Sequence, residues 1–387
     1  MGAPTRSALF CDMKEKRCIA ILANYPIQIH FPDIPHKSSH IAPWLHSVHN
    51  AFKSINEYDI HWIVLCKNIK QEIILKECNQ SFHLIPRARL SIGLCSAYIW
   101  DRRNIKKCID RLKPDILHAW GMEDCYGLCA KDNKDIAILS IQGLLSVCKQ
   151  KAKIAKFERI QAYYEPSVLK KVKYITAESE WARDRVLEIA STAQVDILEY
   201  AVEQRFFTEE RGIDINPNCV MACTNTPIKN VSLAINAFSD KRLSHIKLYI
   251  AGIAKEKFSN LPDNIVLLGK VGRDEMVNLL SKAWGLVHTS LADTGPTIVK
   301  EARVMRLPVI ISENCGAKRY VDNGKSGYII SPYNKEQLIN SVLKITKNRE
   351  ISLSMGLHGS DFCRYYLSEN TMISNLRRLY NQLPRKN

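Results

Sequence analysis

Two carboxylates eight positions apart, Asp293 and Glu301, flank a segment whose residue types suit phosphate binding. Gly295 lets the backbone approach a ligand closely, and Pro296 suits a first helical turn, where its missing N–H costs nothing. The free N–H groups and the dipole of a helix start attract an anion. Glu301 would lie about one and a half turns into that helix, within reach of hydroxyls beside the phosphate. This spacing predicts a site that grips a nucleotide sugar.

Alternating strands and helices must position this segment. Apolar runs predict strands over residues 17–23, 61–66, 114–121, 136–141, 174–179, 219–223, 246–251, 265–268, 285–288, 309–312 and 327–330. Helical spacing predicts helices over residues 41–52, 92–112, 125–131, 180–190, 230–238, 274–282, 335–347, 351–366 and 369–383. Strands separated by helices form parallel sheets with helices on both faces. We therefore expect two successive doubly wound units, with ligand at the C-terminal ends of their strands.

The segment from Asp293 to Glu301 resembles the acidic-x7-acidic signature of retaining, nucleotide-sugar-dependent glycosyltransferases of the GT-B fold, in glycosyltransferase family 4 (glycosyl transferases group 1). The usual signature begins with Glu, and Asp293 stands in its place. The resemblance extends from about Cys18 and is strongest from Glu199 to Tyr333. It implies an α/β chain of two Rossmann-like doubly wound domains that face each other across a cleft.

The resemblance also implies a division of the chain. Residues 1–198 would form the acceptor-binding domain and residues 199–366 the domain that binds the nucleotide-sugar donor. Residues 367–387 would form a helix that crosses back to the first domain. Closure of the two domains would exclude water and limit hydrolysis of the donor.

Three residues match catalytic positions of the family. Asp293 would bond sugar hydroxyls or stabilise positive charge that develops on the sugar ring. Lys229 would lie against the donor diphosphate, where its charge eases departure of the phosphate. His118 would contact the donor sugar near the reacting carbon; many relatives have a second histidine two positions later, where this chain has Trp120.

Other matching positions would hold the donor. Glu301 would accept hydrogen bonds from the ribose hydroxyls. The backbone of Thr294, Gly295, Pro296 and Thr297 would line the phosphates, and Gly252 would close a strand beside the nucleotide. Thr224 stands where the family usually has an arginine, so either another basic residue substitutes or the leaving group is held less firmly.

Ser179 and Arg183 match a strand-to-helix segment that commonly faces the cleft, with Arg183 a candidate phosphate or acceptor contact. Ser38 and Ser39 occupy a region where relatives often have a glycine pair. The chain has no Asp-x-Asp between a strand and a loop, so we expect no metal at the diphosphate. In the family, cations and the helix dipole take over that task.

Composition indicates a soluble globular protein, with 46% hydrophobic and 24% charged residues. No run approaches the roughly 18 apolar residues of a membrane span. The polar start lacks the pattern of a secretory signal, and thirteen scattered cysteines suit a reducing compartment, so we expect a cytoplasmic protein. The net charge is +16, and many of the basic residues lie within residues 87–113 and 149–173. These stretches suit a solvated face or an anionic partner.

The expected partners are a nucleotide sugar, with UDP or GDP as the favoured nucleotide, and a glycan or lipid-linked acceptor; no cofactor and no nucleic acid is expected. Ile154, Phe157, Ile160 and Tyr164 lie at helical spacing within a basic stretch. Such a stretch would dock on anionic lipid at the inner membrane surface.

Four alternatives remain at this stage. An epimerase could use the same fold and the same donor, without an acceptor. A pyridoxal phosphate-dependent phosphorylase would need a Schiff-base lysine motif that we do not find in this chain. A basic nucleic-acid-binding protein would need aromatic-basic stripes or a known module, and neither is evident. A degenerate transferase fold that only binds fits Asp293 in place of Glu and Thr224 in place of Arg.

Overall fold

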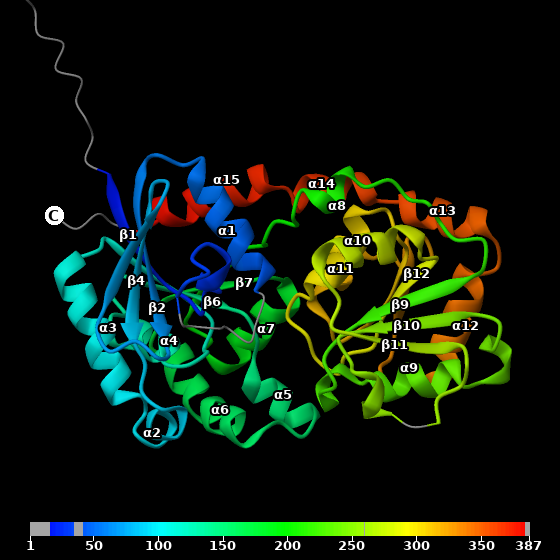
Figure 1. The fold of residues 1–387 in the computed structure, drawn as a ribbon, viewed down its shortest axis with the longest axis horizontal. Coiled ribbons are helices and arrows are strands. Elements are labelled where there is room, and N and C mark those ends of the chain that lie inside the picture. Colours follow the sequence, from blue (N-terminus) through cyan, green and yellow to red (C-terminus); the bar gives the residue numbers. More distant parts are fainter. Residues whose placement is uncertain (1–15, 35–41, 259, 384–387) are drawn as a thin grey trace, which may run out of the picture.

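The structure, a computed structural model, describes residues 16–34, 42–258 and 260–383. Ser38 and Ser39 lie outside the described residues. The described chain contains two sheets in opposite halves of the molecule, each flanked by helices (Figure 1). Two doubly wound α/β units of the Rossmann-like kind are thereby confirmed.

The N-terminal sheet has eight strands in the order β3-β4-β2-β1-β5-β6-β7-β8. The strands are β1 (Arg17–Leu22), β2 (Tyr58–Cys66), β3 (Ile73–Glu77), β4 (Gln80–Pro86), β5 (Ile116–Trp120), β6 (Ala137–Ile141), β7 (Tyr174–Ala177) and β8 (Gln194–Ile197). Only β3 and β4 pair antiparallel among these described strands. This hairpin is absent from the sequence-based prediction, because its short, half-exposed first strand gives little hydrophobic signal.

The helices of this half are α1 (Pro43–Lys53), α2 (Leu90–Cys95), α3 (Ile99–Leu112), α4 (Tyr126–Asp132), α5 (Leu145–Lys151), α6 (Lys156–Leu169) and α7 (Glu180–Ile189), with a short 3-10 helix, η1 (Ile27–Ile29). The single helix predicted over residues 92–112 is wrong. Ala97 and Tyr98 adopt left-handed backbone conformations, with φ of 49° and 55°, and separate α2 from α3. The break lets the Tyr98 ring enter the core, where it is 1% exposed.

The C-terminal sheet has six strands in the order β11-β10-β9-β12-β13-β14, and its recorded pairings are parallel. They are β9 (Asn218–Ala222), β10 (Lys247–Ala251), β11 (Ile265–Gly269), β12 (Gly285–His288), β13 (Val309–Ser312) and β14 (Gly327–Ile330). The helices are α8 (Arg205–Thr208), η2 (Pro227–Lys229), α9 (Val231–Phe238), η3 (Lys241–Leu243), η4 (Lys255–Lys257), α10 (Arg273–Lys282), α11 (Thr297–Val304), η5 (Gly316–Tyr320), α12 (Lys335–Ile345), α13 (Arg349–Leu357) and α14 (Ser360–Tyr366). Gly359, with φ of 66°, divides the helix predicted over residues 351–366.

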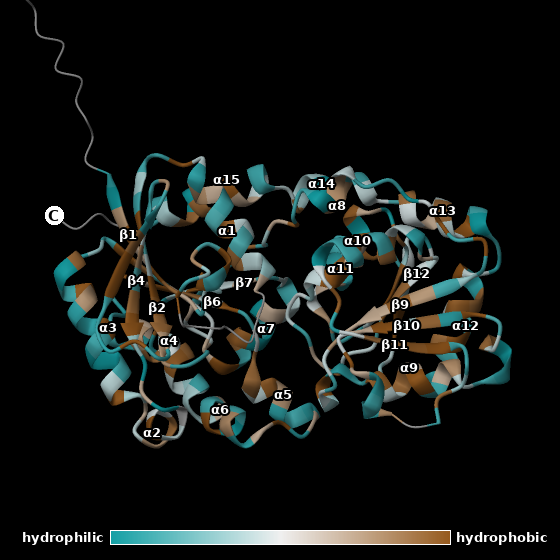
Figure 2. Ribbon diagram, viewed as in Figure 1, coloured by the Kyte–Doolittle hydropathy of each residue, from teal (hydrophilic) through white to brown (hydrophobic). Residues whose placement is uncertain are grey.

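Each sheet carries a hydrophobic core on both faces, as alternation along its strands requires. In β1, Ile19 and Ile21 belong to one core cluster and Ala20 and Leu22 to another. Figure 2 shows the central strands in brown and much of the helices' outer surface in teal. Burial of both faces explains why the strands read as continuous apolar runs.

The last helix, α15 (Glu369–Asn381), packs on the N-terminal half of the molecule (Figure 1). Tyr380 is fully buried there, and its ring lies 5.4 Å from that of Tyr58. Arg17 of β1 donates to the carbonyl oxygen of Leu383 over 2.8 Å. The end of the chain thus ties the two halves together.

Candidate active site

A cavity of about 520 Å³ lies between the two halves. The N-terminal half supplies four lining residues, Pro43, Trp44, Gln142 and Glu178. The C-terminal half supplies Ala222, Cys223, Thr224, Lys229, Ala251, Gly252, Lys270, Val271, Met276, His288, Asp293, Thr294, Gly295, Pro296, Thr297 and Ile298. Eight of the predicted site residues therefore meet around one cavity, at the C-terminal ends of the strands.

Asp293 and Lys229 form an ion pair in the wall of this cavity. The Lys229 Nζ lies 2.6 Å from Asp293 Oδ2, and His288 Nε2 lies 3.3 Å from the same oxygen. Burial opposes the charge on Asp293, but Lys229 and His288 hold its pKa well below the usual range. Burial likewise opposes the charge on Lys229, and Asp293 raises its pKa above the ordinary value. Both groups are therefore charged at neutral pH.

The N-terminus of α11 borders the same cavity. Pro296 has φ of −60° and ψ of 119° and is the cap, so the helix begins at Thr297, one residue later than expected. Thr297 and Ile298 line the cavity, and N–H groups of a first turn have no intrahelical acceptor. Their partial positive charge suits an anion.

Lys270, at the end of β11, is a cation of the cavity that sequence reasoning missed. It lines the cavity together with Thr224, and no carboxylate pairs with it in the described part of the chain. Lys270 can thus supply the positive charge that Thr224 lacks. Gly252 nearby has φ of 93°, and a Cβ there would meet the carbonyl oxygen of Cys223 at 2.4 Å.

Glu301 does not line the cavity. Its side chain is buried, and its Oε1 accepts a hydrogen bond of 2.6 Å from Arg273, which also bonds Glu203 over 2.8 Å. Burial raises the pKa of Glu301, and Arg273 opposes that rise. An arginine distant in sequence thus occupies the carboxylate, and the ribose contact of Glu301 stays a prediction.

His118 also lies outside the cavity lining, and its contact with the donor sugar stays a prediction. It is fully buried in β5, with Nδ1 2.9 Å from the Tyr380 hydroxyl and Nε2 2.7 Å from Ser140 Oγ. Burial lowers its pKa to about 3, so it is neutral. Neither His118 nor Trp120, whose ring packs on it, lines the cavity. The histidine contacts the returning helix α15 rather than the cavity.

Ser179 and Gln142 form a clasp, a pair of hydrogen bonds that holds the loop before α11. The Ser179 hydroxyl donates to the carbonyl oxygen of Thr294 over 2.7 Å, and Thr294 Oγ1 donates to the carbonyl oxygen of Gln142 over 2.9 Å. Arg183 lies elsewhere: it bonds its neighbour Asp184 over 3.2 Å and does not line the cavity. The loop before α11 is thus held by the opposite half of the molecule through Ser179 and Gln142.

A buried charge cluster that sequence reasoning missed lies behind this loop. Lys300 of α11 is 2% exposed, and its Nζ lies 2.6 Å from Glu178 Oε2 and also pairs with Glu199. The Tyr320 hydroxyl donates to Glu199. Glu178 belongs to the N-terminal half, so this cluster anchors α11 across the junction.

The clasp leaves no room for a side chain at Gly316. A Cβ there would meet the Thr294 carbonyl oxygen at 1.9 Å and Ser179 Oγ at 2.0 Å. We expect Gly316→Ala to part the two halves and lower the free energy of unfolding by about 1–3 kcal/mol. Thermal unfolding checks this, with Gly212→Ala as the control, since a Cβ there meets no atom within 4 Å. Equal stability of the two variants would contradict the clasp.

Residues 217–359 match the family described as Glycosyl transferases group 1. An uncharacterised glycosyltransferase of Methanocaldococcus jannaschii is 23% identical over 348 residues, which cover 87% of this chain and 93% of that protein. The C-terminal half of the chain is thus similar to a glycosyltransferase domain. These findings give no support to the epimerase alternative.

Solved structures share the whole fold. Sucrose-phosphate synthase from Thermosynechococcus elongatus has a TM-score of 0.77 at 14% identity, over 95% of this chain and 99% of that one. HepE from Anabaena, in complex with UDP and glucose, has a TM-score of 0.69 at 11% identity, over 95% and 100%. A trehalose-6-phosphate structure from E. coli, bound with UDP-2-fluoro glucose, has a TM-score of 0.70 at 8% identity, over 95% and 100%. The predicted GT-B fold is thereby confirmed.

No helix in the described part of the chain combines the length and apolar character that crossing a bilayer requires.

Proposed function

We propose that this protein transfers a sugar from a nucleotide diphosphate sugar to an acceptor hydroxyl, with retention of the anomeric configuration. The observation that supports this most is the convergence of Lys229, Lys270 and the N-terminus of α11 on one cavity between the two halves. Two cations and the start of a helix form a binding site for a diphosphate. Asp293 lies at the edge of that site.

Each of these groups has a role in the proposed reaction. Lys229 and the first turn of α11 would stabilise the charge that grows on the diphosphate as the glycosidic bond to the sugar breaks. Asp293 would orient Lys229 and face the sugar ring. Because this positive charge comes from the protein, the proposed reaction needs no metal at the diphosphate. The clasp of Ser179 and Gln142 on the loop before α11 would keep water out while the acceptor hydroxyl attacks.

UDP is the first nucleotide to try, because two structures of the same fold are described with UDP or a UDP sugar. The test is calorimetry and thermal shift with UDP, GDP, ADP and their common sugars. We expect saturable binding of one diphosphate, weakened about tenfold or more in Lys270→Glu, where a like charge would face the phosphate. Lys255→Glu is the matched control, because Lys255 is exposed in the same half and does not line the cavity.

Absence of binding to any nucleotide by folded protein would favour the degenerate fold that only resembles a transferase. Binding followed by conversion of the donor in the absence of acceptor would favour the epimerase, and NMR of the donor alone distinguishes that case.

The acceptor side of the proposal rests on a surface around α6. Phe157 is 45% exposed, Ile160 36% and Tyr163 80%. Lys151, Lys153, Lys156 and Arg159 surround them, and all four are exposed. Tyr164, expected on this face, instead packs against the core. Apolar side chains within a basic rim suit an anionic lipid surface, where a lipid-linked acceptor would be available.

Reversal of charge at Lys151, Lys153 and Lys156 should strongly weaken binding to liposomes that contain anionic lipid. Each lysine near such a surface contributes about 1 kcal/mol, so three reversals should lower the partition coefficient by at least two orders of magnitude. Co-sedimentation measures this, with reversal of Lys247, Lys255 and Lys257 in the other half as the control. Undiminished binding of the first variant would exclude this surface as the membrane contact.

A further inference from the structure

Three polar side chains converge beneath α1, away from the cavity between the halves. They are His30, just after η1, His49 of α1 and Glu77 at the end of β3. Glu77 Oε2 lies 3.1 Å from His30 Nδ1 and 3.5 Å from His49 Nε2. One ligand atom of each residue lies within 4.8 Å of the other two.

Tyr25 fixes the two imidazoles from the opposite side. Its hydroxyl oxygen lies 2.7 Å from His30 Nε2 and 2.7 Å from His49 Nδ1. A phenol has one proton, so it donates to one of these nitrogens and accepts from the other. The imidazole that donates to Tyr25, when neutral, has a bare nitrogen on its other side, and that nitrogen faces the carboxylate of Glu77.

In this arrangement a nitrogen lone pair faces the carboxylate of Glu77, and no cationic side chain of the described residues lies between them. Within the described residues, neither His49 Nε2 nor Glu77 Oε2 has a hydrogen-bond partner, and His49 is fully buried. Lys53 does not fill this gap, since its Nζ binds the other oxygen, Glu77 Oε1, over 2.8 Å.

We propose that His30, His49 and Glu77 bind a divalent metal ion of the zinc class. A tetrahedral ion with bonds of about 2.0–2.1 Å places its ligand atoms roughly 3.3 Å apart, close to the separations around Glu77 Oε2. Two imidazoles and a carboxylate are ligands that zinc accepts, with water in the fourth position. Both imidazoles then direct their remaining N–H to the Tyr25 oxygen, as outer partners of metal-bound histidines do.

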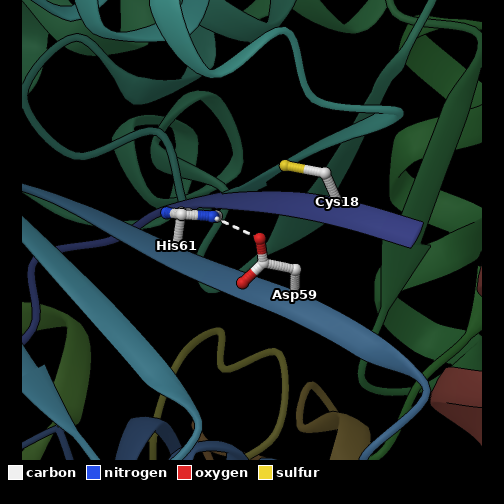
Figure 3. A group of neighbouring side chains, drawn as sticks. All are labelled: Cys18, Asp59 and His61. Atoms are coloured by element: carbon white, nitrogen blue, oxygen red, sulfur yellow. Dashed lines mark hydrogen bonds and ion pairs between the residues drawn. The ribbon is translucent and has the colours of Figure 1, made fainter. Parts of the chain in front are cut away.

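Two other groups of candidate ligands lie in the same half, and the histidines of both are hydrogen-bonded to neighbouring side chains. Figure 3 shows Cys18, Asp59 and His61, in which His61 Nε2 lies 3.0 Å from Asp59 Oδ2. The other nitrogen of His61 lies 3.0 Å from His83 Nε2, and the far side of His83 lies 3.1 Å from Glu72. These contacts are hydrogen bonds, whereas Glu77 Oε2 and His49 Nε2 have no such partner in the described part of the chain, so the nitrogens of His61 and His83 are already occupied.

The proposed ion has a structural consequence for the cavity. It would join η1, β3 and α1, and the first turn of α1 carries Pro43 and Trp44 into the cavity lining. His30 and Glu77 are partly exposed, with 18% and 23% of their side chains open to solvent, which gives an ion a path to the site. The metal would thus hold the N-terminal wall of the cavity without touching the diphosphate.

Zinc analysis and calorimetry on the full chain test the proposal. After removal of metal with a chelator, we expect the protein to rebind one zinc ion per chain. His49→Gln, His30→Gln and Glu77→Gln should each weaken binding by about a hundredfold or more, and Tyr25→Phe by about tenfold. His61→Gln is the matched control and should bind zinc as the parent does. Circular dichroism verifies that each variant is folded, and His30→Gln remains informative if His49→Gln is not.

The cobalt-substituted protein identifies the ligands independently. A site of two imidazoles and a carboxylate gives the visible bands of tetrahedral cobalt. It lacks the intense thiolate-to-cobalt absorption that Cys18, or Cys108 in the group of Glu72 and His83, would produce. A thiolate band, loss of binding in His61→Gln, or failure of the chelated protein to rebind zinc would each overturn the proposal.

Discussion

Lys229→Ala should lower the rate of sugar transfer by about two to three orders of magnitude, the loss typical when one preorganised group that stabilises a growing negative charge is removed. The lysine is already aligned, because Asp293 holds its Nζ at 2.6 Å in the cavity wall. The variant loses the cation and also leaves Asp293 without its lysine partner, so the Asp293 carboxylate would repel the diphosphate. Release of the nucleoside diphosphate under saturating donor is the measurement.

Lys270→Ala provides the comparison for this prediction. Lys270 is exposed and has no carboxylate to orient it within the described residues, so its loss should weaken donor binding more than it slows transfer. Lys229→Ala should have the opposite balance, because charge on the leaving group is greatest in the transition state. A Lys229→Ala enzyme with turnover within about threefold of the parent would refute the assignment.

The donor side of the cavity could be predicted because its residues are local in sequence. One strand, one loop and one helix start bring Asp293 and residues 294–297 to the cavity, and Lys229 precedes α9 in the same manner. Such arrangements depend on turns and helix caps, which the residue types at those positions indicate directly.

The other contacts of the candidate site depend on partners that are distant along the chain. Arg273 forms an ion pair with Glu301. The Tyr380 hydroxyl bonds His118, which lies 262 positions earlier in the chain. The roles of Glu178 and Lys300 follow from the way the two halves meet, which periodicity cannot show. Even Lys270, four residues before a predicted helix, became a candidate only when β11 placed it beside Thr224.

Lys300→Met should lower the free energy of unfolding by about 3–5 kcal/mol, because removal of one partner from a buried ion cluster leaves uncompensated charge. Lys300 lies between Glu178 and Glu199, and all three are buried. The variant leaves two carboxylates without their cation at the junction of the halves. Chemical denaturation of the parent and the variant measures the difference, and Lys325→Met, which removes only an exposed pair, should cost less than about 1 kcal/mol.

The loss in Lys300→Met should also depend on pH in a defined direction. Burial raises the pKa of Glu178 from 4.5 to about 7 even with Lys300 present. Between these two values the folded protein keeps a proton that the unfolded chain releases, so the contribution of Glu178 to stability falls as pH rises from about 4.5 to 7. Without Lys300 the carboxylate becomes still harder to ionise. The deficit of the variant should therefore be smaller at pH 5, where Glu178 is protonated, than at pH 8. Equal deficits at the two pH values would mean that Lys300 contributes through packing rather than through its charge.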